Sequence, residues 1–416
     1  MSLAIVVPAY RVDSQMAGIG VRAWELAQVV ARQMPVTIVA KHISDLSCEN
    51  VTFLEAADAG WLDRVKRCSA ALFYDMPDTR IMLELHRAGV LLITDNAATI
   101  EHLEYSSIRD SENADAIYEE LIARFKLQLL LSDHFIVRSQ VALSTLCVQL
   151  SLVGRLSYLN YNRSSSLEHL VSYIPIGFNR FSDEHASTTA PSLGKIDLVW
   201  NGGIWDFYDP VIFAHALALL DRAGTPVTAR FMYMPPANQL LHEGRKLAEA
   251  VRELRIEHLV QFHEEKLDHY DRDAVVKSAR ATVCIGKKGI ENFTSIRLRT
   301  RDCFLYRLPL IVDNHGATAW LVTELGIGLA CNMASADELA AGVAKLCFDE
   351  AFYKQLLRNL DEVRPQFEID GYVPKLVQVI EQRRRAPDIG RTKHNELVAE
   401  LLRKHPFLEE SPVYPF

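Results

Sequence analysis

The chain has 416 residues, of which 49% are hydrophobic and 24% are charged, and its formal net charge is −8 at pH 7. This length favours two domains, because single hydrophobic cores stop growing near roughly 250–300 residues. The acidic balance argues against a general nucleic-acid-binding protein, which would show a broad basic surface. No apolar run reaches the roughly 18–20 residues that a membrane-spanning helix needs. We therefore expect a soluble, two-domain globular protein.

Cysteine usage and the first residues predict a location. The seven cysteines are scattered, without a C-x-x-C pair or zinc-like spacing, which is typical of reduced thiols in a cytoplasmic protein. The opening MSLAIVVPAY has no basic region, and Pro8 interrupts its apolar run, so it does not resemble a signal peptide. We expect a cytoplasmic protein; a location peripheral to the inner face of the membrane is the alternative.

The first half of the chain alternates between strand and helix patterns. LAIVVPAY is a β-branched run suited to a strand buried on both faces, and VRAWELAQVVARQM after it has helical spacing. The next strand is PVTIVAKHI, which completes a βαβ unit. Further strands are expected at 51–56, 70–75, 90–96, 134–139 and 171–178, with a long helix at 114–131. This order predicts a doubly wound parallel sheet.

A polar segment at 179–195 is the best linker, and strand–helix alternation restarts after it. The chain is thus predicted to be α/β, with two Rossmann-like doubly wound domains facing across a cleft. Ligands of such sheets bind at the carboxyl ends of the strands. The expected parts are a first domain at 1–185, a second domain at 195–365, a helix crossing back to the first domain at 366–386, and a tail with a short amphipathic helix at 387–416.

Gly18 and Gly20 lie between the first strand and its helix. Glycines there let backbone N–H groups approach an anion at a helix N-terminus. Ala23 holds the third position of the dinucleotide fingerprint, and Lys41 and His42 stand where a nicotinamide-binding domain carries an acid. The loop predicts either a contact with an anionic ligand or a tight turn.

Gly202, Gly203 and Trp205 occupy the matching position in the second domain, directly after its first strand. Such a loop lets a ligand approach the backbone and stack on aromatic rings. A structural turn with buried aromatic side chains is the alternative.

Three arginines fall within five residues of the segment ENFTSIRLRTRDCFLYRLPLIVDN: Arg297, Arg299 and Arg301. We predict a helix that starts near Ile296, with Thr294 or Ser295 as its cap. Arginines in its first turn oppose the helix macrodipole by roughly 0.3–1 kcal/mol each. A bound diphosphate would offset this cost, because guanidinium groups grip phosphate oxygens. A solvated basic face is the alternative.

Helical spacing would place Ser295, Arg299, Asp302 and Tyr306 on one face. That face would present the Asp302 carboxylate to ribose hydroxyls while the arginines hold the diphosphate. Lys288, in the turn GKKG after another strand, would reach a phosphate as a point charge, and an exposed turn is the alternative.

Asp95 closes the strand VLLITDN at the edge of the expected cleft. A carboxylate there would orient a sugar or accept a proton from an acceptor hydroxyl, and capping the following helix is the alternative. His102 and Glu104 follow on that helix, where a lone histidine is more often structural. The sequence contains no H-E-x-x-H, Walker or G-x-S-x-G motif, which argues against the three enzyme classes that carry them.

Together these motifs resemble the family-4 retaining glycosyltransferases of GT-B fold, in a bacterial branch found with polysaccharide and glycoconjugate genes. MAGIGVRAWELAQVVA and YIPIGF resemble that branch's first glycine loop and the end of its first domain. VWNGGIWDFYDP resembles its phrase G-G-G-I-W. ENFTSIRLRTRDCFLYRLPLIV resembles its phrase E-T-x-x-S-x-R-T-R-x-x-D-Y-x-W-x-G-L-P. The resemblance covers most of the chain, and it implies that 1–185 is an N-terminal acceptor-side domain and 195–365 a C-terminal nucleotide-sugar-binding domain.

The resemblance assigns motif positions to residues of the arginine-rich segment: Glu291, Ser295, Arg297, Arg299, Asp302 and Pro309. The second acid of the family pattern E-x7-E, which contacts the donor ribose, matches Asp302. The first acid falls on Thr294, a departure, so the resemblance implies that Glu291 takes this catalytic position. The family's basic residues after the second glycine loop are missing, which leaves the arginines and Lys288 as substitutes.

The resemblance implies transfer of a sugar, with retained configuration, from a UDP- or GDP-type donor to a hydroxyl of a sugar or lipid-linked acceptor. No protein nucleophile stands out, so we expect front-face attack, with Asp95 orienting the acceptor or sugar. We expect no cofactor, no metal and no nucleic-acid partner. The tail helix would either pair two protomers as a homodimer or lie on an anionic membrane surface.

Other classes stay open. The Thr294 departure favours a non-catalytic nucleotide-sugar-binding or scaffold protein. A pseudo-glycosyltransferase that couples carbon to nitrogen, or an epimerase, would use the same fold. The loop at Gly18 and Gly20 leaves a Rossmann dehydrogenase as a further alternative, which NAD binding would reveal.

Overall fold

A computed structural model describes residues 1–95, 104–191, 196–234, 242–263, 267–333 and 335–411. The chain divides into two compact units. Unit 1 comprises Met1–Leu103, Ile108–Pro175 and Ile369–Phe416, and unit 2 comprises Glu104–Ser107 and Ile176–Glu368. The short piece Glu104–Ser107 therefore belongs with the second unit, although the first half of the chain carries it.

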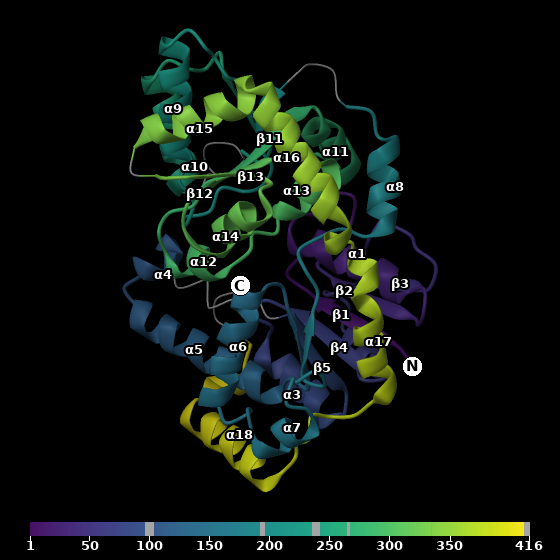
Figure 1. Ribbon diagram of the computed structural model, residues 1–416. Coiled ribbons are helices and arrows are strands. Elements are labelled where there is room, and N and C mark those ends of the chain that lie inside the picture. Colours follow the sequence, from purple (N-terminus) through teal and green to yellow (C-terminus); the bar gives the residue numbers. More distant parts are fainter. Residues whose placement is uncertain (96–103, 192–195, 235–241, 264–266, 334, 412–416) are drawn as a thin grey trace. The chain divides into compact units, whose positions relative to one another are not determined.

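Unit 1 is built on a parallel sheet in the order β3-β2-β1-β4-β5-β6-β7, of which β1 to β5 are labelled in Figure 1. Its strands are β1 Leu3–Val7, β2 Val36–Ala40, β3 Val51–Glu55, β4 Ala70–Tyr74, β5 Leu91–Asp95, β6 His134–Val137 and β7 Val171–Tyr173. Strands β1, β4, β5 and β6 are buried along their whole length. This burial agrees with their continuous apolar runs, since strands covered by helices on both faces need no polar side.

The helices of unit 1 connect these strands and extend to the end of the described chain. They are α1 Ile19–Val30, α2 Trp61–Val65, α3 Thr79–Arg87, α5 Ala114–Leu131, α6 Gln140–Leu152, α7 Tyr158–Arg163, α17 Val373–Gln382, α18 Thr392–Lys404 and the 3-10 turns η4 Ile369–Gly371 and η5 Pro406–Glu409. The short α4, Ser106–Arg109, lies where the chain passes from unit 2 back to unit 1. The helix expected at 114–131 has the same bounds as α5.

Unit 2 repeats the architecture with a six-stranded parallel sheet in the order β10-β9-β8-β11-β12-β13. Its strands are β8 Ile196–Trp200, β9 Ala229–Phe231, β10 Val260–Phe262, β11 Ala279–Cys284, β12 Leu310–Asp313 and β13 Gly328–Cys331. Its helices are α8 Arg180–Thr188, α9 Pro210–Arg222, α10 His242–Glu253, α11 His269–Lys277, α12 Ile290–Thr294, α13 Thr300–Tyr306, α14 Gly316–Leu325, α15 Ala336–Phe348, α16 Glu350–Val363 and η3 Arg364–Phe367. Large aromatic side chains fill its core, including Trp200, Phe213, Phe231 and Phe304.

Part of the segment expected to be a linker is helical. Asn179 caps α8 by accepting a hydrogen bond from the Ser182 backbone N–H. The Lys277 ammonium donates to the Ala186 and Thr189 carbonyls at 2.5 and 2.7 Å, which fixes the end of α8 to unit 2. The polar composition of this segment therefore marks an exposed helix as well as a connection, and residues 192–195 lie outside the described part.

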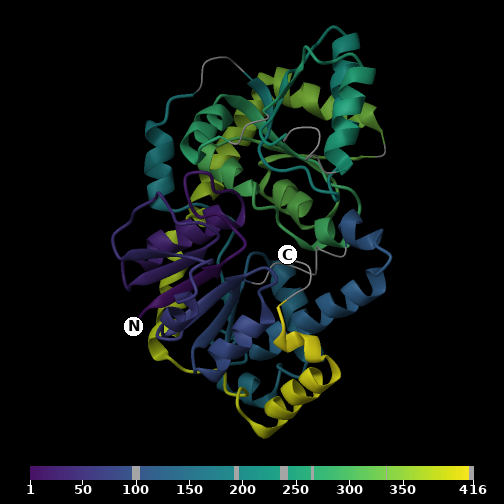
Figure 2. The ribbon, with the colours of Figure 1, turned by 180° about the vertical axis from the view of Figure 1, so that it is seen from behind.

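The tail helix α18 covers unit 1. Its side chains Val398, Leu401 and Leu402 pack against the apolar cluster that also contains the buried Leu408 of η5. Helices α3, α5 and α18 and the turn η5 lie together in both views (Figures 1 and 2). The helix α17, expected to cross back to the first domain, belongs to unit 1 and packs against α1. The apolar face of α18 is thus used inside this unit.

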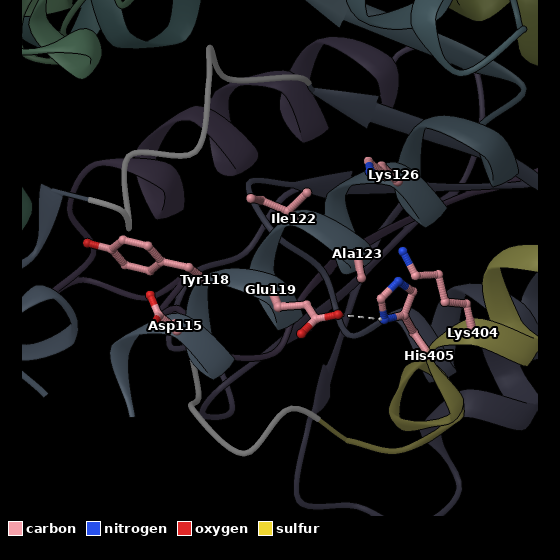
Figure 3. A pocket seen from close by; sticks show the side chains of 8 residues that line it. All are labelled: Asp115, Tyr118, Glu119, Ile122, Ala123, Lys126, Lys404 and His405. Carbon is pink, nitrogen blue, oxygen red and sulfur yellow. Dashed lines mark ion pairs between the residues drawn. The ribbon is translucent and has the colours of Figure 1, made fainter. Parts of the chain in front are cut away.

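A hollow of about 330 Å³ lies between α5 and the end of α18, lined by Asp115, Tyr118, Glu119, Ile122, Ala123, Lys126, Lys404 and His405 (Figure 3). In its lining the Glu119 Oε1 and His405 Nδ1 atoms are 3.6 Å apart. The lining carries acids, bases and apolar groups without a dominant chemistry. None of the site residues expected from the sequence lies there.

The cysteines and the longest helices bear on what the composition predicted. The seven cysteines form no disulfide. Among the described helices, none combines the length and the apolar character needed to cross a bilayer.

The strand order in each unit reverses at one point. In unit 1, strands β1 to β3 are added toward one edge of the sheet and strands β4 to β7 toward the other, so the order reverses between β1 and β4. In unit 2 the same reversal falls between β8 and β11. Open α/β sheets bind ligands beyond the carboxyl ends of the strands at such a switch point. A ligand is therefore expected near the residues that follow β8 and β11 in unit 2. In unit 1 it is expected near the residues that follow β1, β4 and β5.

Candidate functional site

In unit 2 the loops after β8 and β11 are joined by backbone hydrogen bonds. Tyr208 and Gly286 form an antiparallel bridge, and the Lys287 N–H donates to the Phe207 carbonyl at 2.9 Å. The Asp313 carboxylate, at the end of β12, accepts the Gly286 N–H at 2.7 Å. Three neighbouring strand ends therefore form one rigid edge.

Gly202 and Gly203 lie directly beneath Arg299. A β-carbon at position 202 would lie 2.8 Å from the Arg299 Nη2 atom, so only glycine permits this approach. The same Nη2 donates to the Gly203 carbonyl at 2.8 Å. The structure thus brings together the glycine loop and one arginine of the arginine-rich segment.

The Arg299 guanidinium is held in place by aromatic rings. It lies 4.4 Å from the centroid of Tyr208 and 5.4 Å from that of Trp200. Burial raises the pKa of Tyr208 to about 12, so this ring stays neutral beneath the cation. The Arg299 Nη1 atom is buried and has no hydrogen-bond partner among the described residues. A positioned guanidinium with an unsatisfied donor is the strongest indication of an anion site here.

Arg297 is engaged differently, because it forms a buried ion pair with Glu291. The Arg297 Nη1 and Glu291 Oε1 atoms are 2.5 Å apart, and both side chains are almost completely buried. The Arg297 guanidinium also donates to the Asn292 side chain and lies 4.6 Å from the Phe207 ring centroid. Within this structure the Glu291 carboxylate stabilises the loop, and its catalytic role stays a prediction.

The helix expected to start near Ile296 starts later. A short helix, α12, ends at Thr294, residues 295–299 form a connection, and α13 begins at Thr300. Arg297 therefore precedes the helix, Arg299 is its N-cap residue and Arg301 lies in its first turn, so the macrodipole argument applies to Arg299 and Arg301 and not to Arg297. Ser295 is outside α13 and does not share a face with Asp302, which corrects the expected arrangement. The Arg297 side chain, in the connection between the two helices, donates to Glu291 and Asn292 of α12.

Asp302 lies at the centre of a buried polar network. Its carboxylate accepts hydrogen bonds from Arg272, from Arg301 at 2.8 Å and from Asn201 Nδ2 at 2.6 Å. Burial by itself would raise the pKa of Asp302, but the two guanidiniums outweigh burial and lower it. Both carboxylate oxygens are engaged, and the Asn201 contact ties α13 to the end of β8. The ribose contact expected for Asp302 stays a prediction.

The remaining donor-side residues differ in accessibility. Lys288 is exposed in the turn after β11, Ser295 is half-buried, and the Trp205 side chain keeps 44% of its area exposed. The Trp205 ring stacks on Tyr105, with centroids 6.0 Å apart. Of these three residues predicted from the sequence, Trp205 and Lys288 are exposed enough for a ligand at this edge to contact them without a rearrangement of the protein.

Sequence reasoning missed the structural role of the piece Glu104–Ser107. Glu104 Oε1 accepts the backbone N–H of Glu291 at 2.9 Å, and Ser106 binds Asp206. These contacts join positions 100 or more residues apart, so no local sequence signal could have found them. His102 lies outside the described residues.

Unit 1 places its expected residues at the carboxyl edge of its own sheet. Gly18 caps α1 with φ 49°, and a β-carbon at Gly20 would lie 2.1 Å from the Arg11 carbonyl oxygen. Gly18 thus precedes α1 in a positive-φ conformation, and Gly20, in the first turn of α1, allows the close approach of the Arg11 backbone. A ligand contact for them stays a prediction.

Asp95 is completely buried between two arginines. Its oxygens lie 2.5 Å from Arg22 Nε and 2.8 Å from Arg138 Nε. Burial favours the neutral acid, but Arg138 and Arg22 outweigh it and lower the pKa of Asp95. A low-pKa carboxylate with no exposed area is a poor proton acceptor in this state. Its expected catalytic role stays a prediction, and the structure shows it holding two cations at the sheet edge.

No protein-family model matches the sequence, and no curated protein matches it. Among the described residues, no group of three or more histidine, cysteine, aspartate or glutamate side chains is arranged to hold a metal ion.

Solved structures match over nearly the whole chain. Sucrose-phosphate synthase from Thermosynechococcus elongatus has a TM-score of 0.66 and 14% identity, covering 92% of this chain and 98% of its own. WaaG, a glycosyltransferase involved in lipopolysaccharide biosynthesis, has a TM-score of 0.61 and 10% identity, covering 91% and 99%. Anabaena HepE in complex with UDP has a TM-score of 0.60 and 11% identity, covering 92% and 100%.

These likenesses define the fold. Both units are Rossmann-like parallel sheets covered by helices, and the chain has the GT-B fold that the sequence predicted. At identities of 10–14% the likeness extends to the fold alone.

Proposed function

We propose that the protein is a retaining glycosyltransferase that moves a sugar from a UDP- or GDP-type donor to a hydroxyl of a sugar or lipid-linked acceptor. The site geometry that carries this proposal is the Arg299 guanidinium, fixed over Gly202 and Gly203 with one buried donor unsatisfied. A diphosphate oxygen is a suitable partner for that donor. The bound UDP of the similar HepE structure supports UDP as the first nucleotide to test.

The proposed chemistry relies on charge stabilisation. As the bond between the sugar and the diphosphate breaks, negative charge accumulates on the leaving group, and Arg299 and Lys288 would stabilise that charge. In front-face attack the acceptor hydroxyl approaches from the side of the leaving diphosphate, whose oxygen takes the hydroxyl proton. No cofactor or metal is required by this scheme, and metal independence is part of the proposal.

A donor-consumption assay tests the proposal. The protein is incubated with UDP-glucose, UDP-galactose, UDP-N-acetylglucosamine and GDP-mannose, with and without simple glycoside acceptors, and released nucleotide is measured. We expect release from one donor class, and an NMR spectrum of the product that shows retained anomeric configuration. Inverted configuration would contradict the retaining mechanism, and an absence of release with every donor would contradict the enzyme assignment.

One observation favours a second candidate, a non-catalytic nucleotide-sugar-binding protein. Glu291 and Asp302, the two acids that match the family motif, are both buried and ion-paired. Tight binding of a nucleotide sugar without turnover in the same assay would favour this candidate over the enzyme.

We also propose that unit 1 contacts an anionic membrane through α6 and α7 rather than through α18. Six large apolar or aromatic side chains on these two helices and the turn between them are exposed: Val148, Leu152, Leu156, Tyr158, Leu159 and Tyr161. Leu152 is 83% exposed and Tyr158 76% exposed. The surrounding stretch 134–167 contains no acidic residue, although the whole chain carries 53. Exposed Arg163 adds a positive charge, so the surface suits anionic lipid headgroups and the acyl boundary beneath them.

Sedimentation with phosphatidylglycerol vesicles tests this surface. We expect the double variant Leu152→Glu/Tyr158→Glu to bind at least about tenfold more weakly than the parent, since each buried side chain contributes about 1.5–3 kcal/mol. Ile43→Glu, which changes an exposed apolar residue outside α6 and α7, is the matched control and should bind like the parent. The proposal would be contradicted if the double variant bound the vesicles like the parent. It would also be contradicted if the two changes dissociated a homodimer of the chain and left vesicle binding unchanged.

A further inference from the structure

The piece Glu104–Ser107 is fixed to the edge of unit 2 at three consecutive residues. Glu104 Oε1 accepts the Glu291 backbone N–H at 2.9 Å. The Tyr105 ring stacks with the rings of Trp205 and Phe207, at centroid distances of 6.0 and 6.2 Å and interplanar angles of 26° and 19°. This piece therefore lies beside both loops that follow β8 and β11.

Ser106 completes the attachment. Its backbone N–H and its hydroxyl donate to the same oxygen of Asp206, Oδ2, at 2.9 and 2.6 Å. Asp206 belongs to the aromatic segment after the Gly202–Gly203 loop, and its backbone carbonyl accepts from the Lys287 ammonium at 2.9 Å. The carboxylate of Glu104 is thus positioned by its own hydrogen bond to Glu291 and by the contacts of the two residues that follow it, as a preorganised binding group would be.

Gly289 provides a second, independent observation. A β-carbon at this position would lie 2.7 Å from both carboxylate oxygens of Glu104. The backbone of Gly289 is extended, with φ −168°, so alanine would be allowed there by the backbone alone. The glycine is therefore explained by the close approach of the Glu104 carboxylate and not by a turn.

Glu104 is also an acid that a ligand at this edge can reach. Its side chain is half-buried, and its Oε2 atom has no hydrogen-bond partner among the described residues. Glu291, by contrast, is buried and engaged by Arg297. Carboxylates are strong acceptors for hydroxyl donors, since a charge-assisted O–H···O⁻ bond is about twice as strong as a neutral one.

We propose that Glu104 is the residue of this site that recognises the donor sugar, by accepting hydrogen bonds from hydroxyl groups of a neutral hexose attached to the nucleotide. The inference rests on the proposed function, because it requires a nucleotide sugar at unit 2. The Glu104 carboxylate is accessible to a ligand at the arginine-rich edge of unit 2. The acids of the arginine-rich segment itself, Glu291 and Asp302, are already ion-paired with Arg297 and Arg272. It is a specificity-determining residue and is not assigned a proton-transfer role.

Calorimetric titration of the full chain with UDP and with UDP-glucose, UDP-galactose and UDP-N-acetylglucosamine tests the inference. The parent is expected to bind at least one of the UDP-sugars more tightly than UDP. Glu104→Gln should bind UDP like the parent and bind that sugar nucleotide roughly 10–100-fold more weakly, the range for hydrogen bonds to a charged group. Gly289→Ala should reproduce the loss, because its methyl group displaces the carboxylate. Glu249→Gln, an exposed change on α10, is the matched control and should behave like the parent.

The outcomes separate the two proposals. If UDP binds but Glu104→Gln and Gly289→Ala bind all three sugar nucleotides like the parent, the role of Glu104 is wrong and the nucleotide site stands. Tighter binding by Glu104→Gln would show that the carboxylate blocks the site, which also overturns the inference. If the parent binds neither UDP nor any UDP-sugar, and does not bind GDP or GDP-mannose either, the proposed function fails and the inference falls with it.

Discussion

Replacement of Asp302 by alanine is expected to lower the stability of unit 2 by about 3–5 kcal/mol, the cost of removing one member of a buried ion-paired group. The variant leaves the Arg272 and Arg301 guanidiniums buried without their shared carboxylate and releases Asn201 from α13. For a unit of about 200 residues this loss corresponds to a melting temperature lowered by roughly 6–20 °C. Differential scanning calorimetry of parent and variant measures it.

The control is Asp361→Ala, which removes an exposed ion pair with Arg307. Surface changes of this kind usually alter stability by less than about 0.5 kcal/mol. Asp302→Ala with the parent's melting temperature but weakened UDP binding would contradict the structural role and restore the ribose contact that the sequence predicts.

The same network has a defined dependence on pH. The folded-state pKa of Asp302 is lowered from its usual value of 3.8. Its contribution to stability is therefore present above that value and is lost as the pH falls through the lowered folded-state pKa. Acid unfolding of the two proteins should show a difference that shrinks below about pH 4.

Replacement of Arg299 by alanine is expected to weaken UDP binding roughly 10–100-fold, the range expected for charge-assisted hydrogen bonds. The Arg299 guanidinium donates a hydrogen bond to the Gly203 carbonyl of the glycine loop. Its other terminal nitrogen, Nη1, is buried and has no hydrogen-bond partner among the described residues. Calorimetric titration of UDP into parent and variant measures the ratio of dissociation constants. Arg299→Lys keeps the charge but loses the planar fork, so it should recover only part of the affinity.

Arg307→Ala is the matched control for Arg299, because Arg307 is exposed at the far end of α13 and pairs with Asp361. It should bind UDP like the parent. Equal UDP affinity in Arg299→Ala and the parent, with both proteins folded, would show that Arg299 is a structural residue that stacks on Tyr208 and Trp200.

The fold followed from the sequence because its signals are local and repeated. Runs such as LAIVVPAY and VLLITDN are continuous and apolar, which buried parallel strands require, and each became a fully buried strand. Helix α5 has the expected bounds because its apolar spacing runs from Ala114 to Leu131 without a break. The polar segment after Phe178 was the exception, since its composition does not distinguish an exposed helix such as α8 from a linker.

The site followed only in part. The proximity of Arg299 to Gly202 joins two motifs that the resemblance had already linked to one donor. The pairing of Arg297 with Glu291 and of Asp302 with Arg272 could not be predicted, because side-chain partners 6 to 30 residues apart depend on where α12 ends and α13 begins. Glu104 lies 187 residues from Glu291, and only the fold brings them together.

The most direct measurement is a calorimetric titration of UDP, with GDP in parallel, into the folded full-length chain. The proposed function predicts that either UDP or GDP binds saturably, with one nucleotide per chain, and that this binding raises the melting temperature. A folded protein that binds neither nucleotide and shows no thermal stabilisation would contradict the nucleotide-sugar site, and with it the assignment of Arg299 as the group that holds the diphosphate.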